Sequence, residues 1–233
     1  MARIQNYQGR SDGGYTRVVG DAALGKLLSR TQSAIIAAGT ELEKTVYREV
    51  DEQGRAVTDL DAFLEAPTSS AGAYLVNKRS IKKSQRVRIG RSEPDLVIFD
   101  TEQRHVYIVE LKDGDMFDTK KVDGELNTLI TFQNAISPHI PYMTSIHFCS
   151  FNQTDKAQII SGFKGKIDEN QAMTGAELCQ ILRIDYEKIL QQRMSDAAAN
   201  RAFFIDELLK DPMIRKDIIE ILIAAAETSR RSR

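Results

Sequence analysis

The chain has 233 residues, 42% of them hydrophobic and 28% charged, which excludes a disordered chain, a collagen and a disulfide scaffold. No stretch approaches the roughly 18 to 20 consecutive apolar residues of a membrane span, and residues 1–10 lack the apolar core of a secretory signal, so we expect a cytoplasmic protein without a membrane partner. The net charge is −1, so any binding of nucleic acid must depend on a local basic patch.

The first third of the chain is predicted to contain an arm, a long helical region and a basic segment. Residues 1–20 are rich in Gly, Gln, Ser and Arg and are expected to form a loose N-terminal arm. Residues 24–50 carry apolar side chains at helical spacing, interrupted only by Gly39, which predicts one long helix or two in tandem. Residues 74–91 include seven Lys or Arg residues and no acidic residue, so they form the required basic patch.

The middle of the chain is predicted to fold in the order strand, strand, helix, strand. Residues 96–99 and 105–109 are apolar runs separated by a polar segment, which is typical of a hairpin. Both runs are apolar on both faces, so we expect central strands covered on each side. Residues 120–136 are expected to form a helix that ends before Pro138, and residues 145–151 a further strand.

The last third of the chain is predicted to be mainly helical. Apolar residues recur at helical intervals in residues 174–193 and again in residues 201–228. Asp211 and Pro212 are expected to divide the second of these regions, because a proline can begin a helix but disrupts a helix interior.

The residues that carry chemistry lie at the shared end of the two predicted hairpin strands. Asp95 follows Pro94 at the start of the first strand, and Glu110 and Lys112 end the second. Alternate strand residues share a face, so Glu110 and Lys112 point the same way, and the hairpin brings Asp95 alongside them. Two such carboxylates can hold Mg²⁺ together with waters and a substrate phosphate. A lysine beside the metal would orient or deprotonate a water and offset transition-state charge, which suits hydrolysis of a phosphodiester.

The spacing of these residues resembles the PD-(D/E)XK nuclease superfamily, because fourteen residues separate Pro94-Asp95 from Glu110-Leu111-Lys112. The resemblance implies an α/β fold with a restriction-endonuclease-like core, in which a central mixed sheet is flanked by helices. The core order of the family is a helix, a three-stranded meander, a helix and a fourth strand, which places the first meander strand within residues 74–89. Members often carry a glutamate four residues after a glycine on the first helix, which implies Glu43, with Glu41 as the less favoured candidate.

Within the superfamily, the chain looks most like a type II restriction endonuclease, because of its size and its helical C-terminal third. The resemblance implies Mg²⁺-dependent, sequence-specific hydrolysis of phosphodiester bonds in double-stranded DNA by Asp95, Glu110, Lys112 and Glu43, with Asp95 and Glu110 as the metal ligands. It also implies a homodimer, since palindromic DNA sites match two-fold protein symmetry.

The expected organisation is a single nuclease domain over residues 1–233. Residues 1–20 would form the N-terminal arm, residues 24–151 the catalytic core and residues 152–233 a mainly helical C-terminal extension.

The basic segment favours contacts with DNA phosphates, although a solvated strand and turn is the plainer interpretation. The residues expected to make these contacts are Lys78, Arg79, Lys82, Lys83, Arg86 and Arg88. Two alternative functions stay open. The first is a DNA repair or junction-resolving nuclease of the same superfamily. The second is a non-catalytic DNA-binding module, in which the acidic pair is structural and Glu110 and Lys112 form an ion pair at the sheet edge.

Overall fold

The computed structural model describes every residue except 68–69, 91–92, 115–118 and 232–233. Contacts within the chain define two units, one made of residues 1–38 and 190–233 (unit 1) and the other of residues 39–189 (unit 2). Helices α2 (Ala22–Asp51) and α8 (Tyr186–Lys210) contribute residues to both units. None of the described helices combines the length and the apolar character that crossing a membrane requires.

Unit 2 is built on a six-stranded mixed sheet whose strands follow one another in chain order. The strands are β1 (Ala56–Val57), β2 (Ala73–Val76), β3 (Leu96–Asp100), β4 (His105–Lys112), β5 (Met143–Ser150) and β6 (Ala172–Thr174). The meander β2-β3-β4 is antiparallel, whereas the pairs β1-β2, β4-β5 and β5-β6 are parallel. The predicted hairpin is β3-β4, and β4 lies in the interior of the sheet, as its apolar sequence predicts.

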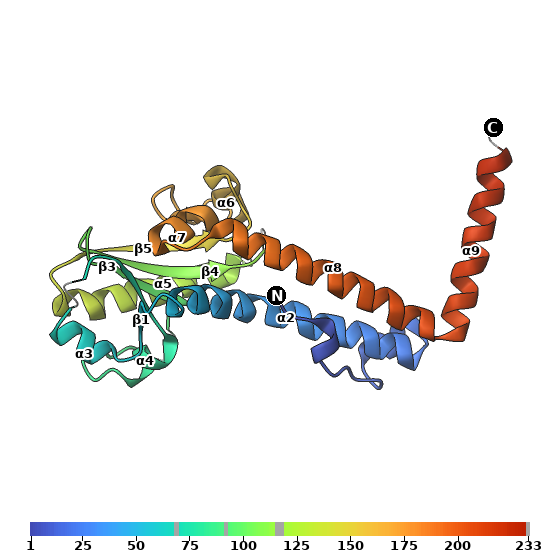
Figure 1. Cartoon of the computed structure of the whole chain (residues 1–233), viewed down its shortest axis with the longest axis horizontal. Coiled ribbons are helices and arrows are strands. Elements are labelled where there is room, and N and C mark those ends of the chain that lie inside the picture. The colour runs from blue at the N-terminus through green and yellow to red at the C-terminus, as the bar shows by residue number, and fades with distance from the viewer. Residues whose placement is uncertain (68–69, 91–92, 115–118, 232–233) are drawn as a thin grey trace. The chain divides into compact units, whose positions relative to one another are not determined.

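Helices flank the sheet of unit 2. They are α3 (Leu60–Glu65), α4 (Lys78–Lys83), α5 (Thr119–Ile136), α6 (Lys156–Gly162) and α7 (Gly175–Leu182), with a short 3-10 helix η2 (Ser137–His139) after α5. Helix α5 packs against β4 and β5, and α7 packs against β2, β5 and β6. Figure 1 shows α5 and α7 on opposite sides of the sheet. The succession of α2, the meander, α5 and β5 confirms the predicted α/β fold class.

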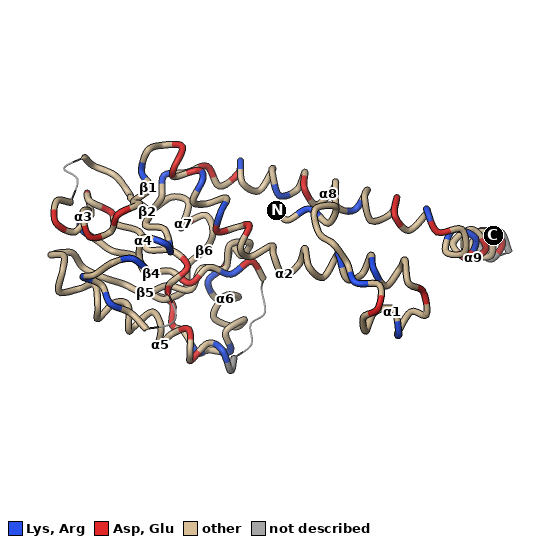
Figure 2. The backbone as a smooth tube through the Cα atoms, turned by 90° about the horizontal axis from the view of Figure 1, so that it is seen from below, with Lys and Arg blue, Asp and Glu red and all other residues tan. Residues whose placement is uncertain are grey.

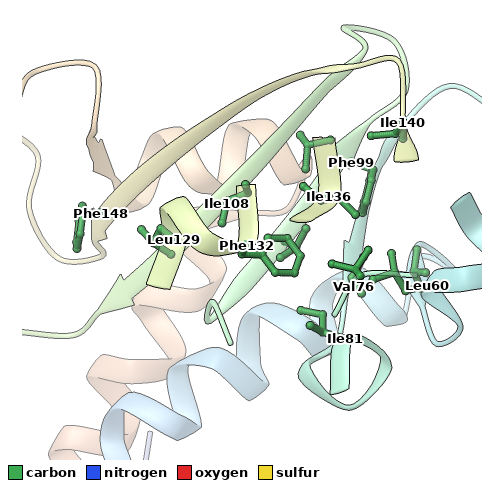
Figure 3. Packing of buried hydrophobic residues seen from close by; sticks show 14 of the residues in the cluster. Leu60, Val76, Ile81, Phe99, Ile108, Leu129, Phe132, Ile136, Ile140 and Phe148 are labelled. Carbon is green, nitrogen blue, oxygen red and sulfur yellow. The ribbon is translucent and has the colours of Figure 1, made fainter. Parts of the chain in front are cut away.

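The core of unit 2 fills the space between the sheet and α5. Phe99 and Ile108 project from β3 and β4 toward Leu129 and Phe132 of α5, and all four side chains are fully buried (Figure 3). The helical spacing of the α5 residues presents them on one face, which explains why this segment was predicted from its apolar pattern. Burial of these side chains fixes α5 against the sheet.

Unit 1 contains η1 (Ile4–Asn6), α1 (Gly14–Val19), the first part of α2, the larger part of α8, and α9 (Pro212–Arg231). The N-terminal residues do not form the loose arm expected from their composition. Ala2 and Ile4 are buried, and the amino group of Met1 lies 2.7 Å from Asp196 of α8. These contacts fix the N-terminus in unit 1, because two apolar side chains are buried and the terminal ammonium forms an ion pair.

Three predicted elements differ from the structure. The first strand of the meander occupies only Ala73–Val76, and most of the basic segment forms the short helix α4 and a following loop, because Asn77 caps a helix at this point. The helix expected over residues 174–193 is divided at Arg183, whose left-handed backbone ends α7. Helix α8 then runs without interruption through residues 194–200, which the sequence analysis left outside a helix.

Candidate active site

The hairpin brings Asp95 and Glu110 together. Leu96 of β3 pairs with Val109 of β4, so extending this antiparallel register by one residue sets Asp95 opposite Glu110. The backbone N–H of Leu111 donates a hydrogen bond of 2.8 Å to Asp95 Oδ2, which holds the carboxylate against the neighbouring strand. Both side chains are largely buried, with exposures of 14% for Asp95 and 13% for Glu110. The two carboxylates therefore form a close, poorly hydrated pair.

Lys112 lies on the same strand face as Glu110, as the alternation of strand residues predicts. Its Nζ is 2.8 Å from Glu110 Oε1 and 2.6 Å from Glu125 Oε1 on α5. Glu125 is a site residue that the sequence analysis missed. Its position in the sequence pointed to the site, because Glu125 lies three residues after Val122 and four before Leu129. This spacing places its carboxylate on the buried face of the helix. A carboxylate on such an apolar face needs a partner in the interior, and here that partner is Lys112.

Helix α2 contributes Glu43 to the same cluster. Glu43 Oε2 lies 2.8 Å from Lys78 Nζ, and the same ammonium lies 2.6 Å from Asp95 Oδ1. The alternative candidate, Glu41, pairs instead with Lys44 one turn along the helix. Between the two glutamates, the structure therefore brings Glu43 toward Asp95.

The remaining basic residues are distributed along α4 and the loop after it. In the sequence no acidic residue interrupts this segment, but acidic residues from other segments approach it in space. Lys82 pairs with Glu93 at 3.4 Å, and Arg86 pairs with Glu65 of α3. Figure 2 shows acidic positions among the basic ones near α4. Because Lys78, Lys82 and Arg86 are paired with carboxylates, this surface is less positive than its sequence indicates. Arg79 and Lys83 have no ion-pair partner among the described residues.

The buried carboxylates have shifted proton affinities. Burial and the charge of Asp95 raise the pKa of Glu110 to about 7, against the opposing effect of Lys112. Burial and Asp95 also raise the pKa of Glu43. For Lys112, burial lowers the pKa, but the charges and hydrogen bonds of Glu110 and Glu125 outweigh it and raise the pKa overall. The cluster thus holds more negative charge than its surroundings neutralise.

This donor set fits a divalent metal cofactor of the Mg²⁺ type. The described residues contain no group of three or more His, Cys, Asp or Glu side chains arranged as a metal cage. Mg²⁺ does not require such a cage, because it keeps several waters and binds through one or two carboxylates together with substrate phosphates. A cation between Asp95 and Glu110 would also relieve the repulsion that raises the pKa of Glu110.

The pKa of Glu110 leads to a prediction about stability without metal. The pKa is higher in the folded protein than in the unfolded chain, so the contribution of Glu110 is full below about pH 4.5 and is lost as the pH rises through about 7. We expect Glu110→Gln to raise the free energy of unfolding by about 2 to 3 kcal/mol above pH 7.5, and to have little effect near pH 4.5.

Urea unfolding in EDTA across this pH range measures the effect. Glu52→Gln, which changes a well exposed carboxylate directly after α2, serves as the control and is expected to follow the wild type. If the free energy of unfolding changed with pH equally in the wild type and in Glu110→Gln, the raised pKa of Glu110 would be contradicted.

Comparisons with known proteins identify the family of the chain and agree with its fold. No protein-family model matches the chain, and no solved structure matches it. The chain is 43% identical over 227 residues to the type II restriction enzyme HhaII of Haemophilus parahaemolyticus, a match that covers 94% of this chain and 98% of that enzyme. The mixed sheet flanked by helices in this chain agrees with the restriction-endonuclease-like fold. Identity at this level across almost the whole of both chains shows that the protein belongs to the type II restriction enzymes.

Proposed function

We propose that this type II restriction endonuclease hydrolyses phosphodiester bonds in double-stranded DNA with Mg²⁺ held by Asp95 and Glu110, and that Lys112 acts on the attacking water. The observation that carries the proposal is the grouping at the end of the hairpin. Asp95 and Glu110 face each other across β3 and β4, and the ammonium of Lys112 lies 2.8 Å from Glu110.

Each residue has a role that follows from its contacts. Bound Mg²⁺ would polarise a phosphoryl oxygen and lower the pKa of a water. The Lys112 ammonium donates hydrogen bonds, so it can orient the attacking water and offset the negative charge that develops on the phosphorus oxygens. The Leu111 N–H keeps Asp95 oriented toward the site. Glu43 supports the site through its ion pair with Lys78 and through its position beside Asp95, whose charge helps to raise the pKa of Glu43.

Phosphate contacts on either side of the cleaved bond are assigned to the basic residues of α4 and its loop. Arg79 and Lys83 are the best placed of these, because no described acidic side chain pairs with them. Lys82, Arg86 and Arg88 could join them if DNA phosphates compete with their present partners Glu93, Glu65 and the Gln85 carbonyl. Such contacts would position the duplex and contribute affinity that falls with rising salt.

A homodimer is the assembly we propose, since each subunit would then cut one strand of a palindromic site. Unit 1 supports this assembly through a large set of exposed aliphatic side chains. Those on α9 are Met213, Ile219, Ile221, Leu222 and Ile223, each at least half exposed. Side chains of this kind, close together on one helix, usually mark an interaction surface, and a second copy of the chain would bury them.

Glu125 is proposed as the residue that positions Lys112. Its Oε1 binds the ammonium at 2.6 Å, and its Oε2 is buried without a hydrogen-bond partner among the described residues. We expect Glu125→Gln to lower kcat by about 10-fold with little change in KM, because a neutral amide restrains the ammonium less firmly. Steady-state kinetics on a cleaved DNA measure both parameters, with Asp123→Asn on the exposed side of α5 as the control. A change confined to KM would argue against a positioning role.

The proposed reaction is tested by incubating the purified protein with unmethylated phage DNA in Mg²⁺, in Ca²⁺ or in EDTA. We expect discrete fragments in Mg²⁺ alone, and sequencing of the fragment ends would give the recognition site. Cleavage into a continuous smear would contradict sequence specificity. DNA that is bound but stays intact in every metal tested would favour a non-catalytic DNA-binding module instead.

A further inference from the structure

Lys78 lies among the carboxylates of the site. Its Nζ is 2.6 Å from Asp95 Oδ1 and 2.8 Å from Glu43 Oε2, both within the range of strong, charge-assisted hydrogen bonds. Its place in the basic segment predicts that Lys78 binds phosphate together with the other basic residues of that segment. Its position in the structure gives it a different set of neighbours from Arg79 or Lys83.

The local structure fixes this position. Lys78 is the first residue of α4 and directly follows Asn77, whose Oδ1 caps the helix by accepting a 2.6 Å hydrogen bond from the N–H of Ser80. The Asn77 amide also donates to the hydroxyl of Tyr47 at 3.2 Å. Tyr47 lies one turn beyond Glu43 on α2. The segment that carries Lys78 is therefore tied directly to the helix that carries one of its two carboxylate partners.

The net charge of the cluster is balanced by one divalent cation. Ion pairs of 2.6 to 2.8 Å connect two ammonium groups with four carboxylates, namely Lys78 with Glu43 and Asp95, and Lys112 with Glu110 and Glu125. With all six groups ionised, the net charge is minus two, which a single Mg²⁺ neutralises. A second divalent cation would make the cluster positive, and it would have to displace the Lys78 ammonium from the Glu43 and Asp95 oxygens.

We propose that Lys78 is a fixed cation that bridges the Glu43 and Asp95 carboxylates, so that each active site binds one divalent metal ion and not two. The inference rests on the proposed function, in which Asp95 and Glu110 hold that ion. Asp95 can serve both cations, because its two oxygens offer more lone pairs than Lys78 and the Leu111 N–H use. An ammonium has three N–H donors, so Lys78 keeps one for a phosphate oxygen of the bound DNA while it contacts both carboxylates.

The number of metal ions tests the inference. Mn²⁺ is titrated into the full-length metal-free protein at pH 8, and electron paramagnetic resonance measures both the free ion and any spin coupling between neighbouring bound ions. We expect one Mn²⁺ per subunit in the wild type, without spin coupling. Lys78→Met is expected to bind two Mn²⁺ with a spin-coupled signal, and Lys78→Arg to bind one. Lys166→Met, which removes a lysine paired with Asp123 on the surface, is the control and is expected to match the wild type.

The outcomes separate this inference from the proposed function. Two spin-coupled Mn²⁺ ions in the wild type would overturn the role of Lys78 and leave the metal site of Asp95 and Glu110 intact. A single Mn²⁺ in a folded Lys78→Met, as judged by its circular dichroism, would overturn it as well. No bound Mn²⁺ in the wild type would overturn the metal site itself, and with it the inference. If Lys78→Met does not fold, two spin-coupled Mn²⁺ ions in the wild type or in Lys78→Arg would still overturn the inference.

Discussion

Replacing Lys112 by alanine is expected to lower the rate of DNA cleavage by about 100- to 1,000-fold, since one preorganised charge near a developing negative charge has an effect of this size. Lys112 lies beside Glu110, where its ammonium can donate hydrogen bonds to the water while the carboxylates hold the metal. Its removal also leaves Glu110 and Glu125 without their shared partner, so the free energy of unfolding is expected to fall at neutral pH.

Single-turnover cleavage of a DNA that contains the recognition site separates these effects, because it reports the chemical step once the DNA is bound. Lys166→Ala is the matched control, because Lys166 also pairs with a carboxylate of α5, but on its exposed side. Binding of DNA in Ca²⁺ should be retained in Lys112→Ala. If Lys112→Ala kept more than a tenth of the wild-type cleavage rate, Lys112 would not act on the reacting atoms.

Asp95→Asn is expected to abolish Mg²⁺-dependent cleavage, with a loss of about 1,000-fold or more. Asparagine has the shape of aspartate and can still accept the hydrogen bond from the Leu111 N–H, so we expect the hairpin to keep its structure. It lacks the negative charge that binds a hard cation, however, and it weakens the ion pair with Lys78. The loss should therefore appear in metal binding as well as in catalysis.

Calorimetric titration with Mg²⁺ or Mn²⁺, together with single-turnover cleavage, measures both losses for Asp95→Asn. The exposed aspartate of α2 gives a control variant, Asp51→Asn, that should behave as the wild type. DNA affinity in EDTA is expected to increase slightly in Asp95→Asn, because one negative charge leaves the surroundings of the phosphates. Metal affinity equal to that of the wild type would place the cation elsewhere.

The residues that could be predicted from the sequence are those whose positions depend on local structure. Asp95, Glu110 and Lys112 lie on one hairpin, so the alternation of strand side chains and the length of the connection are enough to bring them together. Helix α5 and strand β5 were predicted for a similar reason, because their apolar residues follow a single period over a whole element.

The position of Glu125 on the buried face of α5 could be read from the sequence, but its pairing with Lys112 and the position of Lys78 could not, because each depends on contacts between different elements. Lys78 looks like one more member of a basic run until the short helix α4 directs it toward Glu43 and Asp95. Strand β6 and helix α3 were missed because they have only three and six residues, too few to show a period. The break between α7 and α8 depends on the left-handed backbone of Arg183, and a pattern of apolar residues does not predict such a conformation.

The hydrogen bond from the Leu111 N–H to Asp95 has a consequence for how the sequence of this site can change over time. The donor belongs to the backbone, so every amino acid except proline supplies it. Substitutions at position 111 are therefore limited only by the buried space that the leucine side chain fills, and not by the need to orient the carboxylate. Related enzymes can exchange one apolar residue for another between Glu110 and Lys112 and still hold Asp95 in place.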